Sequence, residues 1–134
     1  MEIKVVLDTN RLTDLFRGDA SLAADLGKCD EVLIPVFVLA EIMAGFEGGG
    51  QHAKNELLLR NFLAKPTVEV LYPGRETAAH YARLFNQLRK AGTPIPHNGL
   101  WIAALTLEHN AILITRDRHF DRIPQLDWRS AIGA

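Results

Sequence analysis

Residues 3–16 read IKVVLDTNRLTDLF, and this stretch determines the class of fold. Its first five residues are mostly apolar and β-branched, which is typical of a buried strand. The run stops at the polar residues 8–10, and apolar side chains then recur from Leu12 to Phe16 with helical spacing. The stretch therefore predicts a strand, a polar turn and a helix in direct succession.

The rest of the chain repeats this alternation. Further strands are expected at 32–34, 67–71 and 111–115, with a short edge strand at 126–128. Helices are expected at 21–26, 36–46, 51–64, 75–91 and from residue 98 onward, with Asn98 as the N-cap of the last. Strands that alternate with helices form a parallel sheet covered on both faces. We therefore predict one domain spanning 1–134, a three-layer α/β/α fold around a parallel sheet of four to five strands.

Composition limits the classes of function. The chain has 134 residues, of which 48% are hydrophobic and 23% charged, as in an ordinary globular domain. Its net charge of -1 gives no overall attraction to nucleic acid, although a local basic patch is compatible with it. The single cysteine, Cys29, fits a reducing compartment. With no room for a signal peptide before the first strand and no membrane-spanning apolar run, we expect a soluble cytoplasmic protein without a membrane partner.

Three acidic residues are placed where a parallel sheet binds ligands, outside the carboxyl ends of its strands. Asp8 directly follows the first strand, Asp117 follows the fourth, and Glu41 lies in the second turn of the helix after the second. We expect these carboxylates to share one cleft. Each also has a simpler explanation: Asp8 with Thr9 as a helix cap, Glu41 as a solvent-facing residue, and Asp117 as an ordinary turn residue.

Neighbouring carboxylates repel one another unless a cation is present. An all-oxygen ligand set favours Mg²⁺ or Mn²⁺ over structural zinc. The five histidines have no metal-like spacing, although His97 and His119 flank the proposed cleft. Hard cations held by carboxylates typically act on phosphate groups. The local basic patch that includes Arg116 and Arg118 would suit a polyanionic phosphodiester, and a solvated basic turn is the alternative.

Other phosphate-binding folds lack their motifs here. No GxGxxG or GxxxxGK[ST] follows any expected strand. A phosphatase that forms an aspartyl-phosphate would usually carry a second Asp two residues after the first, but this chain has Asn10. A receiver domain needs an Asp after its third strand, and residues 71–73 offer none.

Three segments together resemble the PIN-domain ribonucleases, specifically the VapC toxins of bacterial toxin–antitoxin pairs. They are VVLDTNRL at 5–12, IPVFVLAEIMAGF at 34–46 and IPHNGLWIAALTLEHNAILITRDRHFDRIP at 95–124. The match covers essentially the whole chain. It implies a PIN-like fold and a Mg²⁺- or Mn²⁺-dependent endoribonuclease that cleaves tRNA or other structured RNA.

The resemblance also implies roles for individual residues and for partners. It gives metal-binding and catalytic roles to Asp8, Glu41 and Asp117. Supporting polar roles fall to Thr9, Asn10 and Thr115. A cognate antitoxin would occupy the groove and neutralise the toxin, a homodimer is common, and promoter DNA is bound only through the antitoxin complex.

Gly99 departs from the family pattern, because similar toxins carry Asp at this place in the segment. Water or Asn98 could fill the gap, with weaker metal binding and a misplaced nucleophile. We therefore predict reduced or lost nuclease activity, with fold and antitoxin binding retained. Gly99 is either native, in which case the alternative function is a catalytically silent, antitoxin-binding homologue, or a selected or introduced inactivating change.

Overall fold

A computed structural model describes residues 2–133 and shows one sheet of five parallel strands in the order β3-β2-β1-β4-β5. The strands are β1 (Lys4–Leu7), β2 (Glu31–Pro35), β3 (Val68–Leu71), β4 (Ile112–Ile114) and β5 (Trp128–Arg129). The predicted parallel sheet is confirmed, and its five strands match the upper end of the expected four to five. The edge strand begins two residues later than expected, because Trp128 and Arg129 are the residues that pair with β4.

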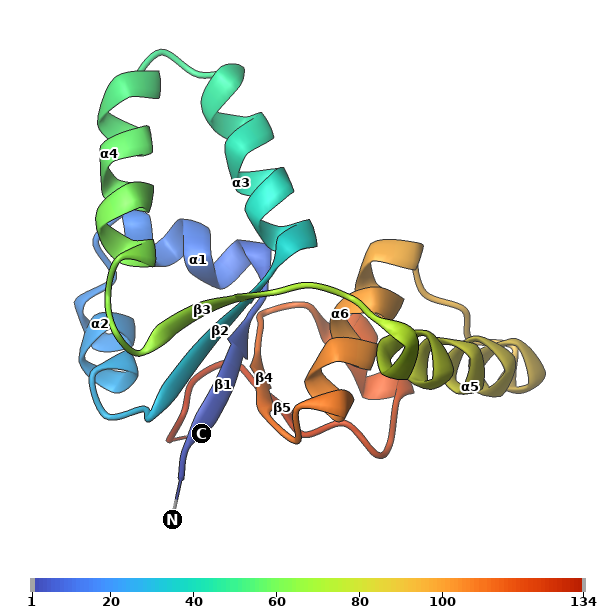
Figure 1. Cartoon of the computed structure of the whole chain (residues 1–134). Coiled ribbons are helices and arrows are strands. Elements are labelled where there is room, and N and C mark those ends of the chain that lie inside the picture. Colours follow the sequence, from blue (N-terminus) through green and yellow to red (C-terminus); the bar gives the residue numbers. More distant parts are fainter. Residues whose placement is uncertain (1, 134) are drawn as a thin grey trace.

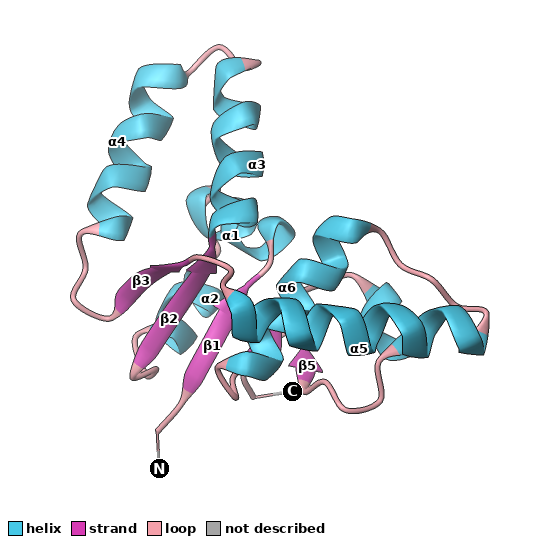
Figure 2. Ribbon diagram, turned by 45° about the vertical axis from the view of Figure 1, so that its right-hand side comes forward, coloured by secondary structure: helices cyan, strands magenta, loops and turns pink. Residues whose placement is uncertain are grey.

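Helices cover both faces of this sheet, which gives the expected three layers (Figure 1). The helices are α1 (Thr9–Phe16), α2 (Ala20–Leu26), α3 (Val36–Glu47), α4 (His52–Leu63), α5 (Arg75–Ala91) and α6 (His97–Glu108). Figure 2 shows α3 and α4 rising from the sheet as a hairpin, while α5 and α6 pack together on the other side. Within residues 2–133, no helix combines the length and the hydropathy needed to cross a membrane.

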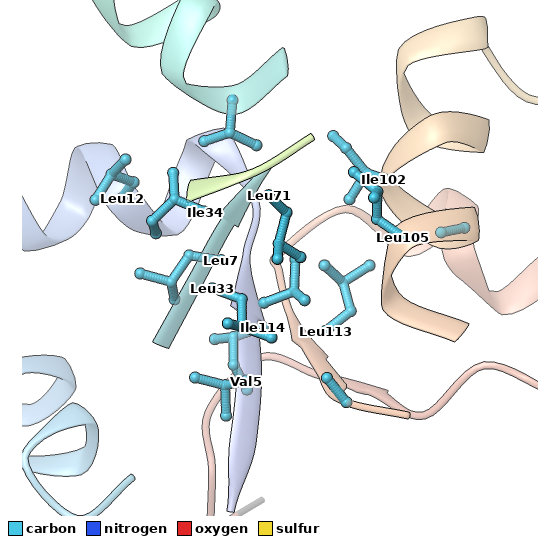
Figure 3. Close-up of a cluster of buried hydrophobic side chains, with 14 of the residues drawn as sticks. Val5, Leu7, Leu12, Leu33, Ile34, Leu71, Ile102, Leu105, Leu113 and Ile114 are labelled. Carbon is cyan, nitrogen blue, oxygen red and sulfur yellow. The ribbon is translucent and has the colours of Figure 1, made fainter. Parts of the chain in front are cut away.

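The core is centred on β1, the middle strand. Val5, Val6 and Leu7 are fully buried because β2 and β4 flank the strand and helices cover both of its faces. Ile102 and Leu105 of α6 lie over the β4 side of this core (Figure 3). Continuous burial explains why residues 3–7 read as an apolar run with little alternation.

The strand order creates a crevice at one edge of the sheet. The chain runs from β1 outward through β2 to β3, and then returns to place β4 on the other side of β1. In open α/β sheets, such a reversal opens a ligand-binding crevice at the carboxyl ends of the strands. The reversal lies between β1 and β4, which are followed by Asp8 and Asp117 respectively.

The start of α6 differs from the sequence-based expectation. Asn98 was expected to be its N-cap, but the N-cap is Pro96 and the helix begins at His97. Pro96 has the extended backbone of an N-cap (φ −59°, ψ 152°), and its carbonyl accepts the first helical bond from Leu100 at 3.1 Å. The missing N–H of proline costs nothing there. Asn98 is therefore the second residue of the helix and Gly99 the third.

Candidate active site

The three acids line one small pocket at this crevice. Asp8, Glu41 and Asp117 come from three segments that follow β1, β2 and β4, and they meet the first turn of α6 around a cavity of about 170 Å³. Asn98 and Gly99 line the same cavity. The placement of acids at strand ends therefore predicted which side chains share the pocket.

Asp8 is both a helix cap and the buried acid of the pocket. It is 8% exposed, its Oδ1 accepts from the Thr9 N–H at 2.8 Å, and its Oδ2 accepts from the Thr115 hydroxyl at 2.7 Å. Burial raises the pKa of Asp8 above its ordinary value, and the charge of Asp117 adds to this. The hydrogen bonds from Thr115 and Thr9 oppose the rise. Both functions considered for Asp8, capping and pocket lining, are thus present together.

Asn10 and Thr115 connect the start of α1 to the exit of β4. The Asn10 amide donates to Thr115 Oγ1 at 3.2 Å, and its Oδ1 accepts from the backbone N–H of Arg116 at 3.0 Å. Thr115 Oγ1 in turn accepts from the Asp117 N–H at 3.0 Å. These bonds hold the segments bearing Asp8 and Asp117 in a fixed relation.

The other two acids are more open to solvent. Glu41 is exposed, and its Oε1 accepts from the Thr9 hydroxyl at 3.2 Å. Asp117 Oδ1 accepts from the His119 N–H at 2.9 Å and lies 2.7 Å from His119 Nδ1. Within residues 2–133, Glu41 Oε2 and Asp117 Oδ2 accept no hydrogen bond. Glu41 and Asp117 therefore each have one carboxylate oxygen free to bind a ligand.

The donor chemistry of the pocket fits a hard divalent cation. The groups that could bind it are carboxylate oxygens, and one of them belongs to Asp8, whose pKa is raised because burial disfavours its charged form. Across the described residues 2–133, no three His, Cys, Asp or Glu side chains already surround one point as a ready-made metal cluster. The pocket thus supplies acids of the right kind, which a bound ion would have to draw together.

Gly99 is not required by the backbone. It lies inside α6, and a Cβ added there would meet Ile95 Cδ1 at 3.5 Å and the Phe120 ring at 3.7 and 3.8 Å. Those are ordinary van der Waals distances. Because Gly99 lines the pocket, a longer side chain at this position has room for its first atom beside the three acids.

The two histidines near the cleft differ in placement. His119 lines the pocket and contacts Asp117, whereas His97 is exposed and does not line it. His97 Nδ1 lies 2.6 Å from the hydroxyl of Tyr81 on α5. Of the pair, only His119 is positioned to meet a ligand of the pocket.

Asp14 is a residue that the sequence analysis missed. Its carboxylate accepts from Arg116 Nε at 2.8 Å and Nη2 at 3.2 Å, and from Arg11 Nη1 at 2.9 Å. The hydrogen bond from Arg116 is the largest cause that lowers the pKa of Asp14. The three-residue spacing of Arg11 and Asp14 could have indicated their pairing, but only tertiary structure brings Arg116 to them.

A larger apolar pocket of about 680 Å³ lies apart from the acids. Helices α1, α2 and α4 contribute Leu15, Leu26, Leu58 and Phe62 to its wall, and no acidic residue lines it. Leu58 is 36% exposed there. This surface is suited to an apolar segment and carries none of the acidic groups of the small pocket.

The sheet is parallel, its strand order reverses between β1 and β4, and acidic residues line a pocket there together with the start of α6. This is the architecture of a PIN domain. The PIN-domain family model matches residues 5–126, nearly the whole chain. The chain belongs to the PIN-domain family.

Individual relatives place it more narrowly. The chain is 33% identical over 129 residues to Ribonuclease VapC1 of Haemophilus influenzae strain R2866, with 92% of this chain and 95% of the relative covered. It is 27% identical to Ribonuclease VapC1 of Methanocaldococcus jannaschii, over 92% of this chain and 84% of the relative. The 2.2 Å structure of VapBC-1 from nontypeable H. influenzae matches with a TM-score of 0.83 and 30% identity, covering 95% and 97% of the two chains. Within the family, this chain is a VapC-type protein.

Proposed function

We propose that this chain is the toxin of a toxin–antitoxin pair, with a Mg²⁺- or Mn²⁺-dependent endoribonuclease site that Gly99 impairs. The observation that carries the proposal is the shared pocket of Asp8, Glu41 and Asp117 at the reversal point of the sheet. The names of the relatives support the ribonuclease assignment. tRNA or another structured RNA is the proposed substrate.

The three acids share one part in this proposal, and neighbouring hydroxyl groups orient two of them. Asp8, Glu41 and Asp117 would hold the ion. Thr9 orients Glu41 and Thr115 orients Asp8 through hydrogen bonds of 3.2 and 2.7 Å respectively. When bound, the ion supplies Lewis-acid chemistry at the phosphoryl group and activates the attacking water. Asn10 holds the start of α1 against the segment that follows β4, through its hydrogen bonds with Thr115 and Arg116.

Gly99 weakens the site because it contributes no carboxylate to the pocket. Mg²⁺ requires near-octahedral oxygen ligation, so an absent ligand would lower the affinity for the ion and would leave the attacking water less well placed. A water molecule or Asn98, which lines the same pocket, would supply the substitute oxygen ligand. The ordinary van der Waals distances of an added Cβ at position 99 support the restoration of a side chain there.

Restoration of the acid tests the proposal. We expect Gly99→Asp, purified without antitoxin, to cleave RNA with Mg²⁺ or Mn²⁺ and to lose that activity in EDTA. Gly99→Asn is the matched control, because it has the same shape without the charge. The proposal is wrong if Gly99→Asp cuts no cellular RNA. Equal cleavage by Gly99→Asp and by the unchanged chain would show that position 99 does not limit activity. If neither protein cleaves RNA, the alternative function as an antitoxin-binding module is favoured.

The antitoxin is the proposed occupant of the larger apolar pocket. Several similar structures are toxin–antitoxin complexes, among them VapBC2 from Rickettsia felis bound to a promoter DNA fragment, at 26% identity, TM-score 0.81, and coverage of 95% of this chain and 98% of that one. An apolar antitoxin segment would bury Leu58 and its neighbours. A homodimer and promoter contact only through the antitoxin belong to the same proposal.

Two neighbouring leucines of α4 allow a matched test of this docking. We expect Leu58→Asp to abolish co-purification with a co-expressed antitoxin, because Leu58 lines the pocket. Leu57→Asp should retain the antitoxin, because Leu57 is 54% exposed and is not part of the wall. If both variants retain the antitoxin equally well, the antitoxin does not bind in this pocket.

A further inference from the structure

A third pocket, of about 450 Å³, lies at the carboxyl ends of β4 and β5. It is lined by Arg116, Arg118, Trp128, Arg129 and Ser130. Arg116 and Arg118 directly flank Asp117, which lines the acidic pocket. The basic pocket therefore adjoins the proposed cleavage site at the same edge of the sheet.

The three guanidinium groups of this pocket are not equivalent. Arg116 pairs with Asp14 at 2.8 Å, and Arg129 pairs with Asp127 at 3.0 Å. These ion pairs hold two walls of the pocket in place and compensate their charges. Within residues 2–133, the Arg118 side chain forms no ion pair and no hydrogen bond. Arg118 is thus the cation left available to an anionic ligand.

Trp128 provides a fixed aromatic wall. It is half-buried, and its indole Nε1 donates to Asp121 Oδ1 at 3.1 Å, which holds the ring in one orientation. Unpaired bases stack on such aromatic faces whatever their sequence, while adjacent arginines take the phosphates. A pocket with both features suits a nucleotide better than a simple anion.

We infer that this pocket is an RNA subsite, in which Arg118 binds a backbone phosphate and Trp128 stacks an unpaired base next to the scissile nucleotide. The inference rests on the proposed ribonuclease function for its substrate class. It adds Trp128 and the wall residue Arg129 to the substrate-binding surface. The subsite would determine how the RNA strand is led past Asp117.

Equilibrium binding in EDTA tests the subsite without requiring cleavage. The probe is a short labelled single-stranded RNA of mixed sequence, followed by fluorescence anisotropy over a range of salt concentrations. We expect Arg118→Gln to weaken binding and to lower the slope of log K against log salt by about 0.7, the value for one phosphate contact on a single strand. Arg60→Gln on α4 removes the same charge far from the pocket and should leave the slope unchanged.

Trp128 is tested by a change in affinity without a change in slope. Trp128→Leu should weaken RNA binding about five- to tenfold at constant slope, because stacking is lost and no charge changes. Trp128→Tyr keeps an aromatic face and should bind like the parent, which separates stacking from any loss of folding seen in a thermal melt. Inorganic phosphate at equal concentration should compete poorly, whereas effective competition would indicate an anion site only.

The outcomes separate this inference from the proposed nuclease function. Unchanged RNA affinity in Arg118→Gln and Trp128→Leu overturns the subsite, even if Gly99→Asp cleaves RNA. If these variants lose antitoxin binding while their RNA affinity is unchanged, the pocket binds the antitoxin and the RNA subsite is overturned as well. If Gly99→Asp fails to cleave while both variants weaken RNA binding as expected, the subsite stands and the nuclease proposal fails.

Discussion

The hydroxyl of Thr115, at the end of β4, donates to the Oδ2 atom of Asp8, at the end of β1, over 2.7 Å. Both residues are buried, and 107 positions separate them in the chain. The bond spans the point where the strand order reverses, so one hydroxyl joins the two sides of the crevice. Thr115 also accepts from the Asp117 N–H, which places a second acid by the same side chain.

Replacement of Thr115 by valine should destabilise the fold. Thr115→Val keeps the shape but removes the 2.7 Å hydrogen bond to Asp8 Oδ2, which then keeps only the long 3.5 Å bond from the Asn10 amide. It also leaves the Asp117 N–H without its partner. We expect the free energy of unfolding to fall by about 1.5–3 kcal/mol, as for other hydrogen bonds to charged groups. Urea denaturation measures it. Thr106→Val is the control, because the hydroxyl of buried Thr106 donates to the Ile102 carbonyl within its own helix and joins no second segment. An equal loss in both variants would contradict the special role of Thr115.

Asp8→Asn should make the stability of the metal-free protein less sensitive to pH. Burial raises the pKa of Asp8, so the folded state disfavours the charged form and loses stability as the pH rises through that pKa. The variant has no proton to lose at position 8, so its stability relative to the parent should rise as the pH increases from the ordinary aspartate pKa of 3.8 to neutral pH. A cost that does not depend on pH accompanies the acceptor oxygen that asparagine lacks. Thermal melts in EDTA across this pH range would show the rise, with Glu69→Gln on the exposed face of β3 as the control.

The same variant should also lose stabilisation by metal. Mn²⁺ should raise the melting temperature of the parent chain, because an ion that binds only the folded state stabilises it. Asp8→Asn should show little or no rise. If Mn²⁺ raises the melting temperature of both proteins equally, the ion binds at a site that does not include Asp8.

Asp14→Asn should weaken the protein at neutral pH but not in acid. Hydrogen bonds from Arg116 and Arg11 lower the pKa of Asp14, so its contribution is present above the ordinary value of 3.8 and is lost as the pH falls through the lower, folded-state pKa. The difference in unfolding free energy between parent and variant should therefore be constant near pH 7 and disappear at strongly acidic pH. A difference that persists in acid would show that the ion pairs do not cause it.

Gly99→Ala should stabilise the protein by about 0.5–1 kcal/mol, because glycine inside a helix has an entropic cost and the Cβ has room. Gly45→Ala, in the exposed part of α3, should give a similar gain. Gly92→Ala should be destabilising, since its φ of 72° belongs to the left-handed region. A loss of stability in Gly99→Ala, measured in urea, would mean that the pocket needs glycine for its shape.

Much of the fold was readable from local patterns. The strand runs at 3–7 and 32–34, and the helical spacing between them, are set by burial that each segment expresses in its own sequence. The boundaries were less well predicted: α6 begins at His97 because the fixed φ of Pro96 supplies the N-cap, which the polar side chain of Asn98 obscured. The edge strand moved to Trp128 and Arg129 because its position depends on pairing with β4.

The sequence by itself determined the class of fold and which acids follow the strands, because strand ends and side-chain types are local properties. Tertiary structure alone decided that Thr115 would bond Asp8, that Arg116 would be held by Asp14, and that Trp128 would share a pocket with Arg118. These contacts join segments on strands whose order in the sheet differs from their order in the chain. No local pattern records that order, so the partners of these polar side chains emerge only when the sheet assembles.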